Sequence, residues 1–167
     1  EAGAVLASDA VSMRHKDHWF VRETIGFMRR TLSRLDVSSR TLFALIEEGS
    51  SFAGTLLELA LACDRIYMLA LPDAPERAPT ITIDEMNLGL YPMATDQSRL
   101  GRRFYDEEPA LAEVRARVGE SLDADAAMKI GLVTSAPDDI DWADEVRIPP
   151  EERAAMSPDA LTGMEAN

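Results

Sequence analysis

The feature that most constrains the fold is a compact succession of strand, turn, helix and strand in the first half of the chain. Residues 41–46 form a short, nearly continuous apolar run, typical of a strand buried on both faces beneath helices. A turn at residues 47–51 follows. The helix expected at residues 56–63 is apolar on almost every side except at Glu58, which predicts a buried helix. Residues 65–69 predict the next strand, so this unit favours a layered α/β domain.

Further elements are predicted on both sides of this unit. A stripe of five apolar residues at helical spacing predicts a helix from about His15 to Leu35; the stripe consists of Val21, Ile25, Met28, Leu32 and Leu35. A strand is predicted at residues 80–83, and helices at residues 95–104 and 109–118. Asp123 is a good N-cap for a short helix that ends at Gly131, and Ser157 is a good N-cap for a last helical turn. We expect residues 1–167 to form a single domain.

Charge and cysteine content restrict the partners and the compartment. The sequence has 17 basic and 30 acidic residues, which gives a net charge of −13. Such a field repels nucleic-acid backbones and anionic membranes, so neither is expected as a partner. The single cysteine, Cys63, excludes a disulfide scaffold and favours the reducing cytoplasm. No apolar run approaches the roughly 18 residues of a transmembrane helix. The chain begins at Glu1 without an initiator methionine, and we expect it to be a piece of a longer chain.

Three blocks of sequence resemble the signature of the crotonase (enoyl-CoA hydratase/isomerase) superfamily. The first block runs from residues 44–49 through Ala53-Gly54-Thr55 into residues 58–64. The second comprises residues 84–92 and 97–100, and the third residues 125–133. The resemblance implies a ClpP/crotonase-like α/β fold, with a repeated β-β-α core in a layered sheet covered by helices. The family's opening strands are missing here, so we expect this fold to be incomplete, with an unpaired sheet edge.

Four stretches, at residues 17–23, 34–40, 54–61 and 156–163, look like those of one family within this superfamily, the benzoyl-CoA-dihydrodiol lyases. Those enzymes, also called 2,3-epoxybenzoyl-CoA dihydrolases, are long chains with two crotonase-like halves, and this sequence resembles the second half. The resemblance implies an enzyme that hydrolytically opens the ring of 2,3-epoxybenzoyl-CoA to a semialdehyde CoA thioester plus formate, in aerobic benzoate degradation. It implies a benzoyl-CoA derivative, the N-terminal catalytic half and further copies of the chain as partners, with no cofactor beyond the CoA of the substrate.

The resemblance also assigns roles to individual residues. Gly54 and Thr55 match the turn whose backbone N–H polarises the thioester carbonyl, although Thr55 stands where the family has glycine. Glu58 and Glu85 align with two catalytic glutamates that activate water and deliver the proton, and the fold is expected to bring them together. The family's second oxyanion donor comes from a Phe-x-x-Gly-x-Asp loop; residues 4–9 are the nearest, weak match to it.

The other charged candidates have two interpretations each. Arg99, Arg102 and Arg103 form the densest basic cluster, which either meets CoA phosphates or is a solvated helix face that pairs with the acidic residues 106–108. Glu58 is alternatively a lone charge that pairs with an arginine, and Glu85 a loop carboxylate in solvent. No metal site is predicted.

Three functions stay open at this point. The chain is a mainly structural half of a CoA-thioester lyase, a compact enoyl-CoA hydratase/isomerase-like enzyme that uses Glu58 and Glu85, or a non-catalytic interaction domain without a CoA site.

Overall fold

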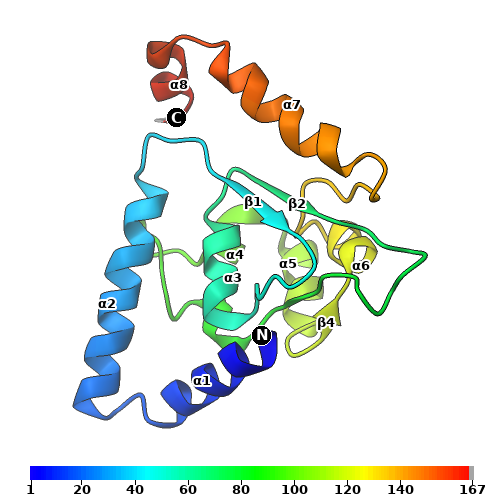
Figure 1. Ribbon diagram of the computed structural model, residues 1–167. Helices are drawn as coiled ribbons and strands as arrows, with labels where there is room; N and C mark the ends of the chain where they lie inside the picture. The colour runs from blue at the N-terminus through cyan, green and yellow to red at the C-terminus, as the bar shows by residue number, and fades with distance from the viewer. Residues whose placement is uncertain (166–167) are drawn as a thin grey trace.

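A computed structural model describes residues 1–165 as a set of helices around two small sheets (Figure 1). The helices are α1 (Ala2–Arg14), α2 (Trp19–Asp36), α3 (Gly54–Leu61), α4 (Arg99–Arg103), α5 (Glu108–Ala116), α6 (Ala124–Lys129), α7 (Trp142–Ala154) and α8 (Pro158–Glu165), with a 3₁₀ turn η1 (Glu85–Leu88). The strands are β1 (Phe43–Ile46), β2 (Arg65–Met68), β3 (Ile81–Thr82) and β4 (Ser121–Leu122). No helix among these residues is long and apolar enough to cross a bilayer.

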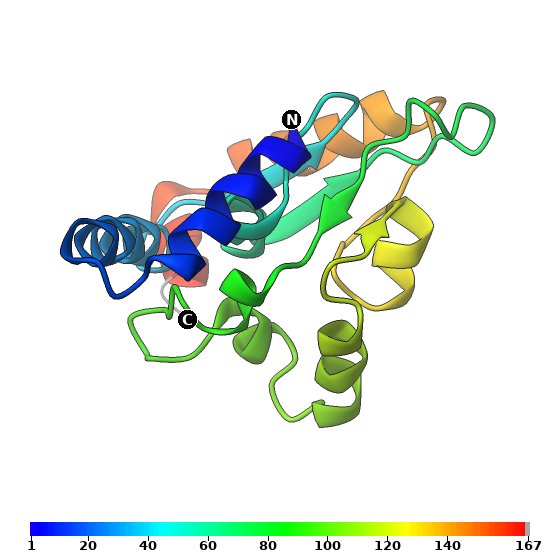
Figure 2. The ribbon, with the colours of Figure 1, turned by 90° about the horizontal axis from the view of Figure 1, so that it is seen from below.

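Helix α3 contacts a strand of each of the two sheets. Strands β1 and β2 pair in parallel, with Phe43 opposite Arg65, as expected for strands joined by a crossover helix. Strands β3 and β4 pair antiparallel, and a bridge between Ala53 and Thr82 ties the start of α3 to β3. Helix α2 lies on one side of the strands, and α5 and α6 lie on the other (Figure 2). Helix α1 packs against α3, and α7 and α8 run along the opposite edge of the molecule (Figure 1).

Two groups of buried apolar side chains hold these elements together. The main core lies between the sheets, α3 and helices α4 to α6, and its fully buried members include Ile46, Leu57, Ile66, Met68, Ile83, Leu100, Val114 and Leu132. A smaller core joins α2 to η1 through Leu32, Met86 and Tyr91. The predicted apolar stripe of α2 faces this smaller core, because Ile25, Met28 and Leu35 pack against it. Burial of these side chains provides most of the stabilising free energy.

Most predicted elements are present, and several boundaries differ. The N-caps are confirmed, because Asp123 accepts the N–H of Ala126 at 2.9 Å and Ser157 accepts that of Ala160 at 3.1 Å. The prediction that one helix begins at about His15 is wrong. Helix α1 ends at Arg14, residues 15–18 form a turn, and α2 begins at Trp19. No pattern predicted α7, whose interior contains two prolines, residues that normally interrupt a helix.

The expected burial of the central unit is only half right. In β1, Ala44 and Ile46 are buried but Leu45 is 41% exposed. In α3, Leu56 and Leu59 are 37% and 40% exposed. An apolar run predicts burial on both faces only when helices or strands cover both, and the described segments cover these three side chains only in part. The molecule therefore presents apolar residues on α3 that its own described chain leaves in solvent.

Gly131 ends α6 in a conformation that other residues adopt at a cost. Its φ is +75°, and a Cβ there would lie 3.2 Å from the Phe104 ring. We expect Gly131→Ala to lower the free energy of unfolding by about 1–2 kcal/mol. Gly163→Ala is the control, because Gly163 lies within α8 with nothing near its Cβ position. This change should raise stability by up to about 1 kcal/mol. Urea unfolding measures the unfolding free energy of both variants. Equal changes in the two would contradict a special conformational role for Gly131.

Candidate functional site

The turn at the start of α3 is the expected thioester-binding element. Its N-cap residue, Ala53, is extended, and Gly54 has a φ of +45°, which favours glycine. The backbone N–H of Thr55, in the first turn of α3, has no partner within the helix. Here it donates to the carboxylate of Asp9 from α1 at 2.7 Å, and the Thr55 hydroxyl donates to the same carboxylate at 2.7 Å. The N–H that was expected to bind a thioester oxygen is thus bound by a carboxylate of this chain.

Asp9 is held tightly in this position. It is 5% exposed, and a Cβ on Gly54 would run into its carboxylate. The Tyr91 hydroxyl lies 3.2 Å from that of Thr55 and closes the other side of the group. Burial raises the pKa of Tyr91, so this phenol stays protonated. The expectation that residues 4–9 form a donor loop is wrong, because they lie within α1, where the backbone N–H groups are used by the helix.

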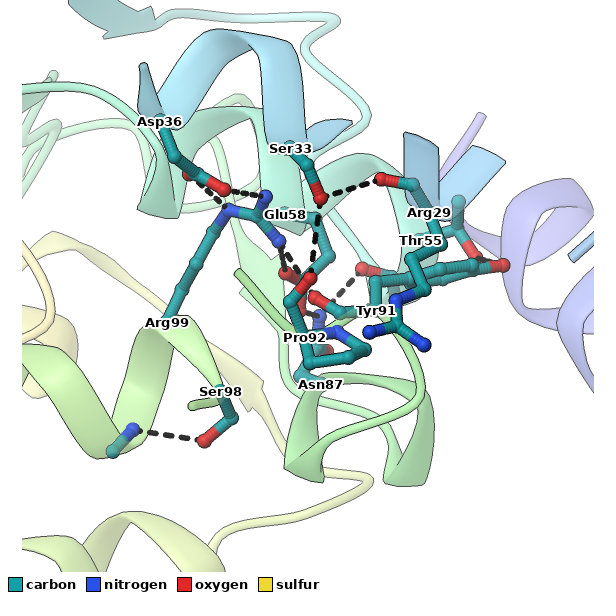
Figure 3. A network of polar contacts seen from close by, with 12 residues as sticks. Arg29, Ser33, Asp36, Thr55, Glu58, Asn87, Tyr91, Pro92, Ser98 and Arg99 are labelled. Atoms are coloured by element: carbon teal, nitrogen blue, oxygen red, sulfur yellow. Dashed lines mark hydrogen bonds and ion pairs between the residues drawn. The ribbon is translucent and has the colours of Figure 1, made fainter. Parts of the chain in front are cut away.

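Glu58 lies one turn further along α3, within a buried polar network (Figure 3). Its Oε1 accepts a hydrogen bond from the Asn87 side chain at 2.8 Å, and its Oε2 accepts one from Arg99 Nη1 at 2.7 Å. Arg99 extends between two helices and also donates to both carboxylate oxygens of Asp36, at 3.0 and 2.6 Å. The Tyr91 carbonyl accepts a further bond from Arg99 at 2.9 Å. The network therefore joins α2, α3, α4 and η1.

We call this network the Arg99 clamp, because one buried guanidinium binds carboxylates from two helices. The side chains of Glu58, Asp36 and Arg99 are each 4% exposed or less, so two negative charges share one buried positive charge. Burial raises the pKa of Glu58, and the hydrogen bonds from Asn87 and Arg99 act in the opposite direction. Within residues 1–165, no buried side-chain nitrogen or oxygen lacks a hydrogen-bond partner. Such a satisfied network fixes its members in place.

The two glutamates differ in exposure, and a different side chain of η1 binds Glu58. Glu85 is exposed at the start of η1, whereas Glu58 is 2% exposed within the buried network, so the two carboxylates lie in different environments. Asn87, two residues further along, reaches Glu58 instead. Asn87 also donates to the Gly54 carbonyl at 2.8 Å, and its oxygen accepts the N–H of Asp84 at 2.9 Å. The side chain that η1 supplies to the α3 site is therefore an amide.

The three arginines of the basic cluster separate into two environments. Arg99 is buried in the network, so its guanidinium does not reach the surface where a CoA phosphate would approach. Arg103 donates from Nε to the Gly131 carbonyl at 3.1 Å, and Arg102 lies over the Tyr105 ring at 5.8 Å. Neither Arg102 nor Arg103 forms an ion pair with the acidic residues 106–108 in the described part of the chain.

Sequence analysis missed Asp9, Asp36, Asn87 and Tyr91. Asn87 had a detectable signal, because Asp84 and Asn87 form a reciprocal capping box at η1. Asp9 and Asp36 had none: α1 shows no apolar periodicity, and Asp36 reads as the end of a helix. Cys63 is no substitute nucleophile, because burial and the neighbouring Asp64 raise its pKa to about 11. Among residues 1–165, no group of three or more histidine, cysteine or acidic side chains is placed to hold a metal ion.

Comparison with solved structures identifies the class of fold. An enoyl-CoA hydratase from Geobacillus kaustophilus aligns over 92% of this chain and 54% of its own, with a TM-score of 0.62 and 22% identity. An enoyl-CoA hydratase/carnithine racemase from Magnetospirillum magneticum covers 92% of this chain and 55% of its own, with a TM-score of 0.66 and 19% identity. The chain therefore has part of the crotonase fold, which confirms the predicted fold class. No protein-family model matches it.

One curated relative narrows the resemblance. Over all 167 residues, the chain is 58% identical to a benzoyl-CoA-dihydrodiol lyase from Aromatoleum evansii. The chain spans 30% of the length of that relative. The predicted resemblance to the benzoyl-CoA-dihydrodiol lyases is confirmed, and it concerns a segment of such an enzyme.

Removal of Arg99 tests whether the network is a clamp. Arg99→Met leaves the carboxylates of Glu58 and Asp36 buried without their cation, and we expect it to cost about 3–5 kcal/mol of unfolding free energy. The matched control is Arg115→Met, which breaks an exposed pair with Glu108 and should cost at most about 1 kcal/mol. Urea unfolding compares the two. Similar, small losses would show that the network does not hold the helices together.

Proposed function

We propose that this chain is a segment of a benzoyl-CoA-dihydrodiol lyase and that it acts there as a non-catalytic scaffold. Support for the parent enzyme is the 58% identity over all 167 residues to such a lyase. The parent would open the ring of 2,3-epoxybenzoyl-CoA to a semialdehyde CoA thioester plus formate, in aerobic benzoate degradation. Its CoA would arrive with the substrate. A cytoplasmic location and assembly with further copies stay predictions from the sequence.

The contact between Asp9 and Thr55 carries the scaffold role. Crotonase-type chemistry needs backbone N–H groups aimed at an oxygen that becomes negative during the reaction. In this chain the Thr55 N–H is bound by a carboxylate, whose charge repels a second anion at the same place. The lost interaction is large, because a missing oxyanion donor typically costs about 3 kcal/mol of transition-state stabilisation. This turn is therefore poorly suited to hold a reacting thioester.

The glutamates support the same proposal. A general base must reach the water or carbon acid from which it takes a proton. Glu58 is 2% exposed, and each of its oxygens already accepts a charge-assisted or amide hydrogen bond. Glu85 is exposed at the start of η1 and forms none of the hydrogen bonds of the Asp9–Thr55 group. Neither carboxylate is thus poised for acid–base work beside the α3 turn.

An exposed apolar face indicates where the scaffold would meet the rest of the enzyme. We define the α2–α3 face by Phe20, Phe27, Leu56 and Leu59, which are 37–64% exposed. A hollow of about 140 Å³ between Phe27, Leu56 and Leu59 is almost wholly apolar. Since the chain spans 30% of its relative, most of a lyase of that length lies outside these residues. We propose that the catalytic part of the same protein covers this face, because burial of such a surface is favourable.

Conservative variants of the glutamates in the full-length lyase distinguish scaffold from catalyst. Glu85→Gln should leave kcat for ring opening within about twofold. Glu58→Gln should lower the thermal stability, because Arg99 loses a buried partner, while kcat per folded molecule stays unchanged. Loss of a catalytic acid or base typically lowers the rate by about 10²–10⁴-fold. A loss of that size in either variant, with folding intact, would instead support the alternative in which Glu58 and Glu85 are catalytic.

A charge placed on the α2–α3 face tests the docking proposal. In the full-length protein, Leu59→Glu should separate the segments and raise the rate of proteolysis between them, because a charge is costly to bury. Ile140→Glu is the control: Ile140 is 84% exposed and lies outside the face. Limited proteolysis followed by mass spectrometry measures the rate of cleavage between the segments in each variant. Equal digestion of both variants and the wild type would show that this face is free in the enzyme.

A further inference from the structure

A pocket of about 410 Å³ lies between α1, α2 and the first turn of α3. One wall is the face of α1 that carries Val5, Asp9 and Ser12, whose spacings of four and three place them on one side of the helix. The facing wall is α2, through Ile25 and Met28. We call this space the Asp9 pocket. Its volume is within the roughly 300–1,000 Å³ of pockets that hold small molecules.

Asp9 brings a buried carboxylate without a counterion to this pocket. The buried carboxylates of Glu58 and Asp36 share the Arg99 guanidinium. Asp9, which is 5% exposed, forms no ion pair with any described residue. Its two hydrogen bonds come from neutral donors, the backbone N–H and the hydroxyl of Thr55. The carboxylate is thus hydrogen-bonded, but no positive side chain neutralises it.

The N-terminal end of α3 offsets only part of this charge. A helix N-terminus acts as about half a positive charge, and Asp9 reaches it through the Thr55 N–H. A negative charge therefore remains where most water is excluded, and a cation is attracted more strongly there than in water. A carboxylate has about four acceptor positions, of which Thr55 uses two. Asp9 can accept further hydrogen bonds from a donor in the pocket.

Tyr91 adds a second acceptor at the base of the pocket. The Thr55 hydroxyl gives its single proton to Asp9, so the contact of 3.2 Å between the Tyr91 and Thr55 hydroxyls needs Tyr91 as its donor. The lone pairs of the Tyr91 oxygen then remain for other donors. Tyr91 and Asp9 both line the pocket and are both at most 5% exposed. The base of the pocket is therefore built to receive hydrogen-bond donors.

We propose that the Asp9 pocket binds a small organic cation, a primary amine on an apolar stem. An ammonium group has three donors and no acceptor, which matches the Asp9 carboxylate and the Tyr91 oxygen. The apolar stem would lie against Ile25 and Met28. The field of a chain with net charge −13 draws cations toward the pocket. This ligand is opposite in charge to the oxyanion of crotonase chemistry, and the site is independent of the scaffold role.

Calorimetric titration of the full-length lyase with phenethylamine tests the proposal. Phenethyl alcohol has the same apolar body without the charge and should bind at least about tenfold more weakly. Asp9→Asn keeps an oxygen that accepts from Thr55 but removes the charge, and it should weaken amine binding at least about tenfold. The control is Asp17→Asn, which removes one charge from the exposed turn between α1 and α2. It should leave the affinity within about twofold.

A second variant tests the site with Asp9 in place. Ser12→Phe narrows the pocket and should also weaken amine binding at least about tenfold. Its control is Ala7→Phe, at an exposed position on the other side of α1, which should bind the amine like the wild type. Melting curves without amine verify that each variant is folded.

Three results would overturn the proposal. The first is the absence of saturable amine binding to the wild type. The second is equal affinity for the amine and the alcohol, which would show an apolar cavity without charge recognition. The third is amine affinity that neither Asp9→Asn nor Ser12→Phe changes. Ring-opening activity is measured separately and without amine, so a failed amine site and a failed scaffold role give different results.

Discussion

The guanidinium of Arg99 is the interaction on which the arrangement of this chain depends. It comes from α4 and binds Glu58 on α3 and Asp36 at the end of α2, while it also caps the Tyr91 carbonyl after η1 (Figure 3). A buried ion group of this kind gives little net stability over an apolar core, but it is very costly to leave half-formed. Four elements that are separate in sequence are thereby held in one relative position.

The turn at the start of α3 matches the crotonase signature in sequence, but two sets of contacts within the chain bind its polar groups. Glu58 stands where the superfamily resemblance places a catalytic glutamate, but Arg99 and Asn87 take both of its oxygens. The Thr55 N–H stands where an oxyanion donor is expected, but Asp9 takes it. Residues 4–9 lie in helix α1 rather than in a donor loop, and Asp9 of this helix binds the Thr55 N–H.

The groups available to a partner protein lie on the surface of α2 and α3 rather than at the α3 turn. Apolar side chains on α2 and α3 remain exposed in the described part of the chain. The proposed scaffold role rests on side chains outside the Arg99 network, such as Leu59 on the α2–α3 face.

The sequence by itself determined the central strand–helix–strand order, the helix caps at Asp123 and Ser157, and the crotonase resemblance, because periodicity, capping and motif spacing are local properties. It also allowed Glu58 to be an arginine partner, without naming Arg99. Only the tertiary structure decided that Asn87 binds Glu58 and that Asp9 binds Thr55. It also decided that Leu59 is exposed. These outcomes depend on how α1, α2 and η1 pack around α3, and contacts across tens of residues leave no periodic trace in the chain.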